Sequence, residues 1–154
     1  MSATVAHPIV TAAGSARGRR AVIALALLAG GIGGLALGAH ADVPASEVEL
    51  TQLLRAMAVL KLFFVAAAAG AIFWRLQAPV AWPRLGAYAL VCAAMAAGPG
   101  MIWYMAHLGP ASLLLHGGVA LSVLLLWQDQ TVATLLEDAI QRRRVAIRSR
   151  ATRR

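Results

Sequence analysis

"AAGPGMIWYMAHLGPASLLLHGG", residues 96–118, places Pro99 between two glycines inside a long apolar run and sets a second Gly-Pro pair at 109–110. Two histidines, His107 and His116, follow the first break. We divide the apolar sequence around this stretch into two spans, 85–108 and 110–127. Each is near the roughly 20 residues that a helix needs to cross about 30 Å of hydrocarbon.

Two further apolar blocks, 21–39 and 53–74, precede this pair of spans. Of the 154 residues, 60% are hydrophobic and 13% are charged, a composition that excludes an ordinary water-soluble globule. The apolar runs are continuous rather than alternating, which favours helices over a β-barrel. We therefore predict an all-α membrane protein, a bundle of four transmembrane helices. The expected domains are a disordered cytoplasmic N-terminus at 1–20, a transmembrane helical domain at 21–127 and a basic cytoplasmic tail at 128–154.

The arginines of the chain predict its orientation. Three arginines precede the first span, Arg75 and Arg84 flank the connection between the second and third, and seven follow the fourth. The connection at 40–52 has three acids and no Lys or Arg. By the positive-inside rule, we expect both termini on the cytoplasmic side of a bacterial-type inner membrane. The net charge of +8 does not indicate nucleic-acid binding, because no reading element accompanies it.

The first block also has features of a secretory signal peptide. It follows "RGRR" and ends with "AHA" before Asp42, a pattern of the A-x-A cleavage type. Its apolar stretch is longer than the usual h-region of about 7 to 15 residues, which favours retention. Cleavage after Ala41 would leave three spans in the same orientation.

Three glycines of the first span, Gly30, Gly34 and Gly38, recur every four residues and leave one strip of the helix without side chains. Such strips allow close helix packing in membranes. The small residues at 65–71, "VAAAAGA", make the second span the expected partner. Homodimerisation through the strip is the alternative.

Ionisable residues inside spans mark functional sites by default, since a charge in hydrocarbon is costly. Lys61, Pro99 and His116 fall at a similar depth, roughly 9 to 12 Å below the outer end of their spans by the helical rise. A kink at Pro99 beside the other two residues would create a polar intramembrane site. The alternative is a purely structural kink, with Lys61 reaching outward and His116 hydrogen-bonded to Ser112.

The segment after Trp127 predicts a short amphipathic helix along the inner leaflet, with acids early and arginines late. The arginines are expected to bind anionic lipids at the cytoplasmic face. These lipid-binding candidates are Arg142, Arg143, Arg144 and Arg148.

No cofactor and no metal are expected. Met101, Met105 and His107 include ligand types that suit copper(I), but His107 points away from the face that the two methionines share. A haem with two histidine ligands would need His107 and His116 at one depth, and they differ by roughly 9 Å. Cys92 is the only cysteine, which excludes an internal disulfide and a cysteine-based zinc site. No catalytic arrangement can be built from the loops, so we expect no enzyme.

The second block, "LLRAMAVLKLFFVAAAAGAIFWRL" at 53–76, resembles the lysine-bearing helix of bacterial copper-resistance membrane proteins. The resemblance covers one span of four, and no functional residue is carried over from it. We expect a small, non-catalytic, multi-pass inner-membrane protein that is an accessory or scaffolding partner of a larger membrane system. Its expected partners are the lipid bilayer and a membrane protein or further copies of the chain. The alternative is small-solute, proton-coupled or copper-handling transport at the polar intramembrane site.

Overall fold

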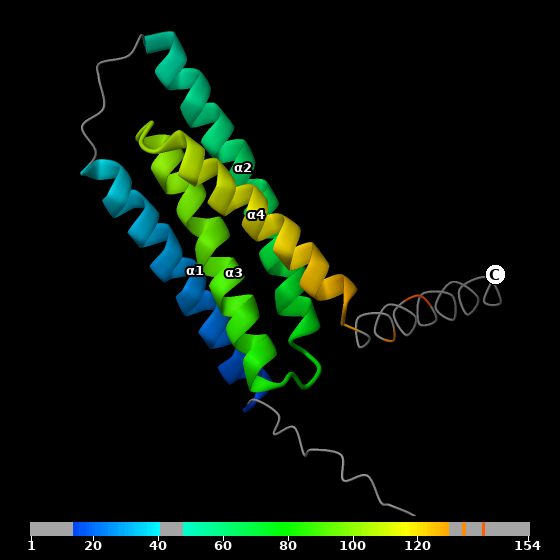
Figure 1. Cartoon of the computed structure of the whole chain (residues 1–154). Helices are drawn as coiled ribbons and strands as arrows, with labels where there is room; N and C mark the ends of the chain where they lie inside the picture. The colour runs from blue at the N-terminus through cyan, green and yellow to red at the C-terminus, as the bar shows by residue number, and fades with distance from the viewer. Residues whose placement is uncertain (1–13, 41–47, 130–133, 135–139, 141–154) are drawn as a thin grey trace, which may run out of the picture.

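Over the residues that it describes, the computed structural model of the chain is an all-α bundle of four helices (Figure 1). The helices are α1 (Ala16–Ala39), α2 (Val48–Arg75), α3 (Trp82–Trp103) and α4 (Leu108–Trp127). The structure describes residues 14–40, 48–129, 134 and 140. All four helices are long and apolar enough to cross a membrane, which agrees with the four spans expected from the sequence.

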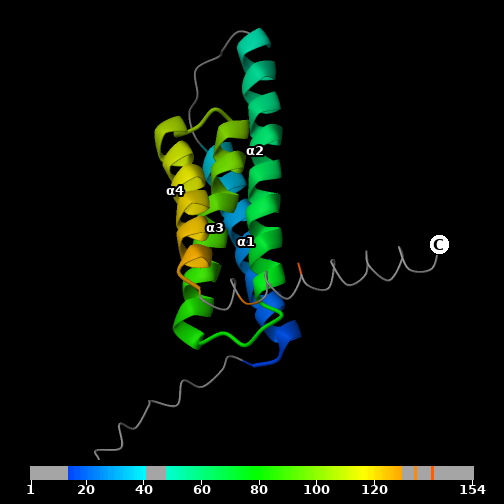
Figure 2. The ribbon, with the colours of Figure 1, turned by 90° about the vertical axis from the view of Figure 1, so that its right-hand side faces the viewer.

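The third helix is the centre of the bundle, because α1, α2 and α4 all pack against it (Figures 1 and 2). In the most apolar 18-residue stretch of α3, half of the residues are buried. The corresponding fraction is 17% for α1 and 22% for both α2 and α4. The largest buried cluster includes Leu85, Tyr88, Cys92 and Met95 of α3. The outer faces of the other helices carry many exposed leucines, as expected for surfaces that meet lipid.

The glycine strip of α1 lies against α3. A Cβ atom added to Gly30 would lie 2.1 Å from the carbonyl oxygen of Ala93, and one added to Gly34 would lie 2.1 Å from that of Ala97. The expectation that the strip packs against the second span is therefore wrong. The reason is that α3 has its own small residues four apart, so the backbones of α1 and α3 meet at two successive turns.

Pro99 lies inside α3, and the helix continues past it to Trp103. The glycines beside it face different neighbours. A Cβ on Gly98 would lie 2.8 Å from the carbonyl oxygen of Ala111 in α4, and one on Gly100 would lie 2.7 Å from the amide nitrogen of Leu35 in α1. The Gly-Pro-Gly sequence thus lets two helices approach α3 closely from two sides.

The connection between α3 and α4 differs from the predicted one, because α3 ends at Trp103 rather than at 108. The chain turns at Met105 and His107, whose φ angles of 57° and 48° lie in the left-handed region. Pro110, expected as the first residue of the fourth span, lies in the first turn of α4, which begins two residues earlier at Leu108. Proline is tolerated there because first-turn amides have no acceptor within the helix.

The beginning of α1 also differs from the prediction. Ala16–Arg20, expected to belong to a disordered segment, are helical. The Ser15 side chain accepts a hydrogen bond from the amide of Gly18 at 3.1 Å and so caps this helix. The rest of the predicted N-terminal segment, residues 1–13, lies outside the described residues. So does most of the predicted amphipathic tail, including Arg142, Arg143, Arg144 and Arg148.

Replacing Gly34 with Ala is expected to lower the free energy of unfolding by about 1 to 3 kcal/mol, because the new methyl group would collide with the backbone of Ala97. Gly33 is a matched control, since a Cβ there would meet nothing within 4 Å. Gly33→Ala should be neutral or stabilising by up to about 1 kcal/mol through helix propensity. Thermal unfolding in detergent measures both variants. Equal stability of the two would contradict the α1–α3 contact.

Candidate functional site

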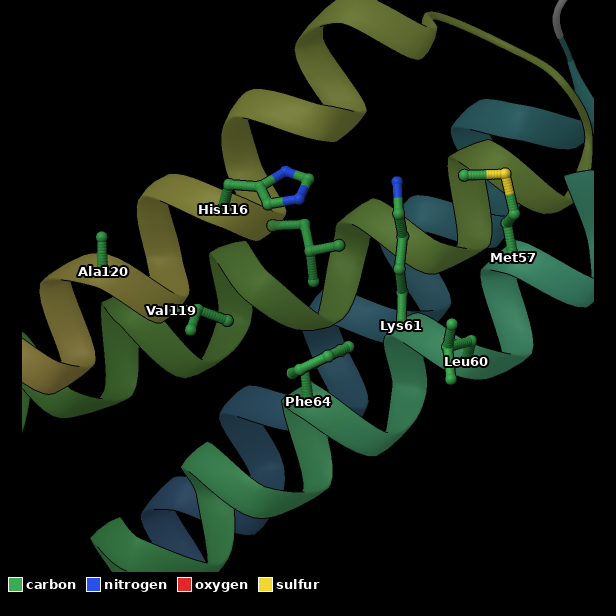
Figure 3. Close-up of a pocket in the computed structure, with 8 residues that line it drawn as sticks. Met57, Leu60, Lys61, Phe64, His116, Val119 and Ala120 are labelled. Atoms are coloured by element: carbon green, nitrogen blue, oxygen red, sulfur yellow. The ribbon is translucent and has the colours of Figure 1, made fainter.

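A groove of about 410 Å³ lies between α2 and α4 and contains both polar residues singled out from these helices, Lys61 and His116. Figure 3 shows Lys61 extending from α2 across the opening and the imidazole of His116 reaching toward it from α4. The rest of the wall is apolar and consists of Met57, Leu60, Phe64, Leu115, Val119 and Ala120.

Lys61 and His116 lie at the same depth because the two helices are in register at the α3–α4 turn. The hydroxyl of Thr51 in α2 lies 3.9 Å from the sulfur of Met105 in that turn. Lys61 follows Thr51 by ten residues, a rise of roughly 15 Å, and His116 follows His107 by nine residues, roughly 14 Å. The structure thus brings together two residues that are 55 positions apart in the sequence.

His116 is held by its own helix. Its Nδ1 atom lies 2.8 Å from the carbonyl oxygen of Ser112 and 3.1 Å from the Ser112 hydroxyl. A carbonyl oxygen only accepts, so the Nδ1–H donates to it, and the Nε2 atom of the neutral ring is an acceptor. The hydrogen bond to Ser112 that the structural alternative predicted is therefore present. This hydrogen bond orients the ring through Nδ1, so the Nε2 atom stays available to accept a hydrogen bond from a ligand.

Pro99 does not belong to this groove, so the predicted three-residue site is wrong in this respect. Pro99 lines a separate apolar pocket of about 160 Å³, together with Leu35 of α1 and with Ala58 and Leu62 of α2. The helical rise places a residue at a depth, but it does not give the rotation of its helix. In α3 the rotation is set by Gly98 and Gly100, which must face α4 and α1.

A buried polar network lies at the end of the bundle where α2 ends and α3 begins. The Nε atom of Arg75 lies 2.5 Å from Oδ2 of Asp129, and the two side chains are 2% and 1% exposed. Arg84 approaches the other carboxylate oxygen at 3.3 Å, and the Tyr88 hydroxyl donates to Oδ2 at 3.4 Å. Asp129 lies two residues after the end of α4, so this carboxylate links α4 to α2 and α3.

The remaining helix reaches the same end through Arg19. Its guanidinium donates to the carbonyl oxygens of Leu76 and Ala78, at 3.0 and 3.2 Å, in the connection between α2 and α3. A third hydrogen bond, at 2.6 Å, goes to the carbonyl oxygen of Gly14. All four helices are therefore tied by polar contacts at one end of the bundle.

Sequence reasoning missed the ion pair, although a signal for it was present. Arg75 directly follows Trp74, and Asp129 follows Trp127 by two residues. Both tryptophans are interface residues expected at the same membrane boundary. An arginine and an aspartate that each follow a tryptophan at the same membrane boundary lie at a similar depth and are therefore candidates for an ion pair. The sequence alone does not predict the pair, because Arg75 also fits a topology signal and Asp129 also fits a cytoplasmic tail.

The other polar candidates have separate surroundings. The Arg55 guanidinium lies 5.3 Å from the centre of the Trp103 ring, a cation–π geometry. Met101 is buried and His107 is exposed at the start of α4. Across residues 14–40 and 48–129, no group of three or more His, Cys, Asp or Glu side chains is arranged to hold a metal ion.

Comparison with known proteins identifies no relative. No protein-family model, no curated protein and no solved structure matches the chain. The resemblance of residues 53–76 to a helix of copper-resistance proteins thus stays an observation about one helix. Function has to be argued from the groove and the polar network.

Replacing Asp129 with Asn is expected to lower the free energy of unfolding by about 3 to 5 kcal/mol, because Arg75 would be left as a buried, unpaired charge. The double variant Arg75→Met with Asp129→Asn should be more stable than Asp129→Asn alone. Arg84→Met is the control, since its side chain is 45% exposed and should contribute no more than about 1 kcal/mol. Denaturant unfolding in detergent measures the set. Equal losses for Asp129→Asn and Arg84→Met would refute the dominant role of Arg75.

Proposed function

We propose that this protein is a non-catalytic accessory protein of a bacterial-type inner membrane, which holds its basic C-terminal segment at a fixed point for a larger membrane system. The observation that carries the proposal is the buried ion pair of Arg75 and Asp129. Asp129 lies two residues after the end of α4, and the arginine-rich sequence follows it along the chain. The ion pair thus fixes the residue from which this sequence continues.

The position of the arginines supports cytoplasmic termini. Arg19, Arg75 and Arg84 all lie at the end of the bundle that carries the polar network. The opposite end carries Glu49 in the first turn of α2. Basic residues gather on the cytoplasmic side of inner-membrane proteins, so the network end is the cytoplasmic end.

The packing of α1 favours its retention over removal as a signal peptide. Its glycine strip contacts the α3 backbone, and Arg19 binds carbonyl groups of the α2–α3 connection. Loss of residues up to 41 would expose the small-residue face of α3 to lipid. With α1 retained, the protein has four spans.

A basic segment held beside the membrane can attract anionic lipids and the acidic surface of a membrane protein. Each Lys or Arg near an anionic lipid surface contributes about 1 kcal/mol of attraction. Arg142, Arg143, Arg144 and Arg148 would together hold the segment at the inner leaflet, where an acidic surface of a membrane-protein partner can bind it. Such a segment would act as a scaffold through its position and its charge.

A second candidate, small-solute transport, is favoured by one observation: Lys61 and His116 line a single groove inside the membrane region. The two candidates use different parts of the chain. A transporter reconstituted alone in liposomes would move a solute in a Lys61-dependent manner, whereas a scaffold would not.

Replacing Arg142, Arg143, Arg144 and Arg148 with Gln should release co-purifying protein partners in mild detergent. The loss should be about tenfold or more, which corresponds to about 1.4 kcal/mol, because the acidic surface of a partner would lose four opposing charges. The Lys61→Met variant is the control and should keep its partners. Quantitative mass spectrometry of the purified complexes measures the ratio. Retention of the same partners by the arginine variant would exclude the scaffold proposal.

Topology gives an independent check. A reporter that is active only in the cytoplasm, fused after Arg154, should be active, and the same reporter inserted next to Pro44 should be inactive. The intact mass of the purified chain reports whether α1 is present. A chain that starts at Asp42, or a C-terminal fusion with periplasmic activity, would contradict the proposed four-span arrangement.

A further inference from the structure

The α2–α4 groove has one formal positive charge and no carboxylate to match it. The acids in the described part of the chain are Glu49, at the start of α2, and Asp129, which is held by Arg75 at the other end. Among the described residues, no carboxylate therefore lies in the groove beside Lys61. A ligand with a single negative charge complements it.

The hydrogen-bonding capacity of His116 fits a carboxyl group on that ligand. With Nδ1–H donating to Ser112, the Nε2 atom of the neutral ring accepts a hydrogen bond from the O–H of a carboxylic acid. The protonated ring would instead donate to a carboxylate oxygen, and the Lys61 ammonium donates in either case. The pair therefore accommodates both the neutral acid, which enters hydrocarbon at low cost, and its anion.

The size and walls of the groove favour a slender apolar body behind this head group. Its volume of about 410 Å³ lies within the roughly 300 to 1,000 Å³ of small-molecule sites. Its walls cover about two turns of α2, from Met57 to Phe64. A partner helix of about 10 to 12 Å diameter would need small residues at the contact, whereas Met57, Leu60 and Phe64 are bulky.

We propose that the groove binds a long-chain fatty acid, with its carboxyl group at Lys61 and His116, the first part of its chain against the apolar walls and the rest of the chain among the surrounding lipids (Figure 3). The ligand enters sideways from the lipid, where fatty acids already reside. This binding site is independent of the scaffold role of the basic segment, since the groove is lined by the middle of α4, whereas the segment follows the end of that helix in the sequence.

Oleate labelled with carbon-13 at its carboxyl group tests the site on the full-length protein in phosphatidylcholine nanodiscs. We expect one saturable carboxyl resonance that empty nanodiscs do not show. Lys61→Met should weaken binding by about tenfold or more, as expected for loss of a charge-assisted hydrogen bond. Lys61→Arg, which keeps the charge, should restore most of it. Oleyl alcohol, with the same chain and no charge, should not displace oleate.

Two matched pairs of variants control for folding. Ala120→Phe fills the groove and should abolish binding, whereas Ala66→Phe, at an exposed position of α2 outside the groove, should not. His116→Gln should weaken binding, whereas His107→Gln, at the exposed start of α4, should not. Circular dichroism during heating verifies that each variant is folded.

Three results would overturn the proposal. Unchanged oleate binding by Lys61→Met would show that the charge plays no part. Displacement of oleate by oleyl alcohol at equal concentration would reduce the groove to an apolar gap that any lipid chain fills. Displacement by a synthetic transmembrane peptide with one central Glu, at lower concentrations than unlabelled oleate requires, would identify the occupant as a partner helix.

Discussion

The close approach of the α1 and α3 backbones at Gly30 and Gly34 is the contact on which the rest of the bundle depends. Lipid chains are as apolar as leucine, so burying leucines between helices gains little in a membrane, and packing at short range has to hold the helices together. The carbonyl oxygens of Ala93 and Ala97 occupy the space that side chains would fill at the two glycines. With α1 fixed on one side of α3, the other sides of α3 are left to α2 and α4, and these two form the groove between them.

The polar network complements this packing at one end of the bundle. Helices held only by van der Waals contact can slide along one another, but a buried ion pair has one geometry. Arg75 and Asp129 fix the end of α2 relative to the end of α4, and Arg19 fixes the beginning of α1 relative to the α2–α3 connection. The two helices that form the groove at Lys61 and His116 are thus joined at one end by the ion pair.

The number of membrane-spanning helices and their approximate positions follow from the sequence, because apolar blocks can be located by reading hydrophobicity along the chain. The depths of Lys61 and His116 follow as well, because the helical rise is constant. The rotation of each helix does not follow. Pro99 has a suitable depth but lines another pocket, because Gly98 and Gly100 dictate which side of α3 faces each neighbour. The end of α3 was missed because Met105 and His107, rather than a glycine, adopt the left-handed turn.

The order in which the ribosome makes the chain gives the ion pair a further consequence. Asp129 is synthesised 54 residues after Arg75. The ion pair therefore cannot form until α4 and the two residues after it have been made. A chain that stops within α4 has Arg75 without this counter-ion. Completion of the polar network is thereby coupled to the arrival of α4.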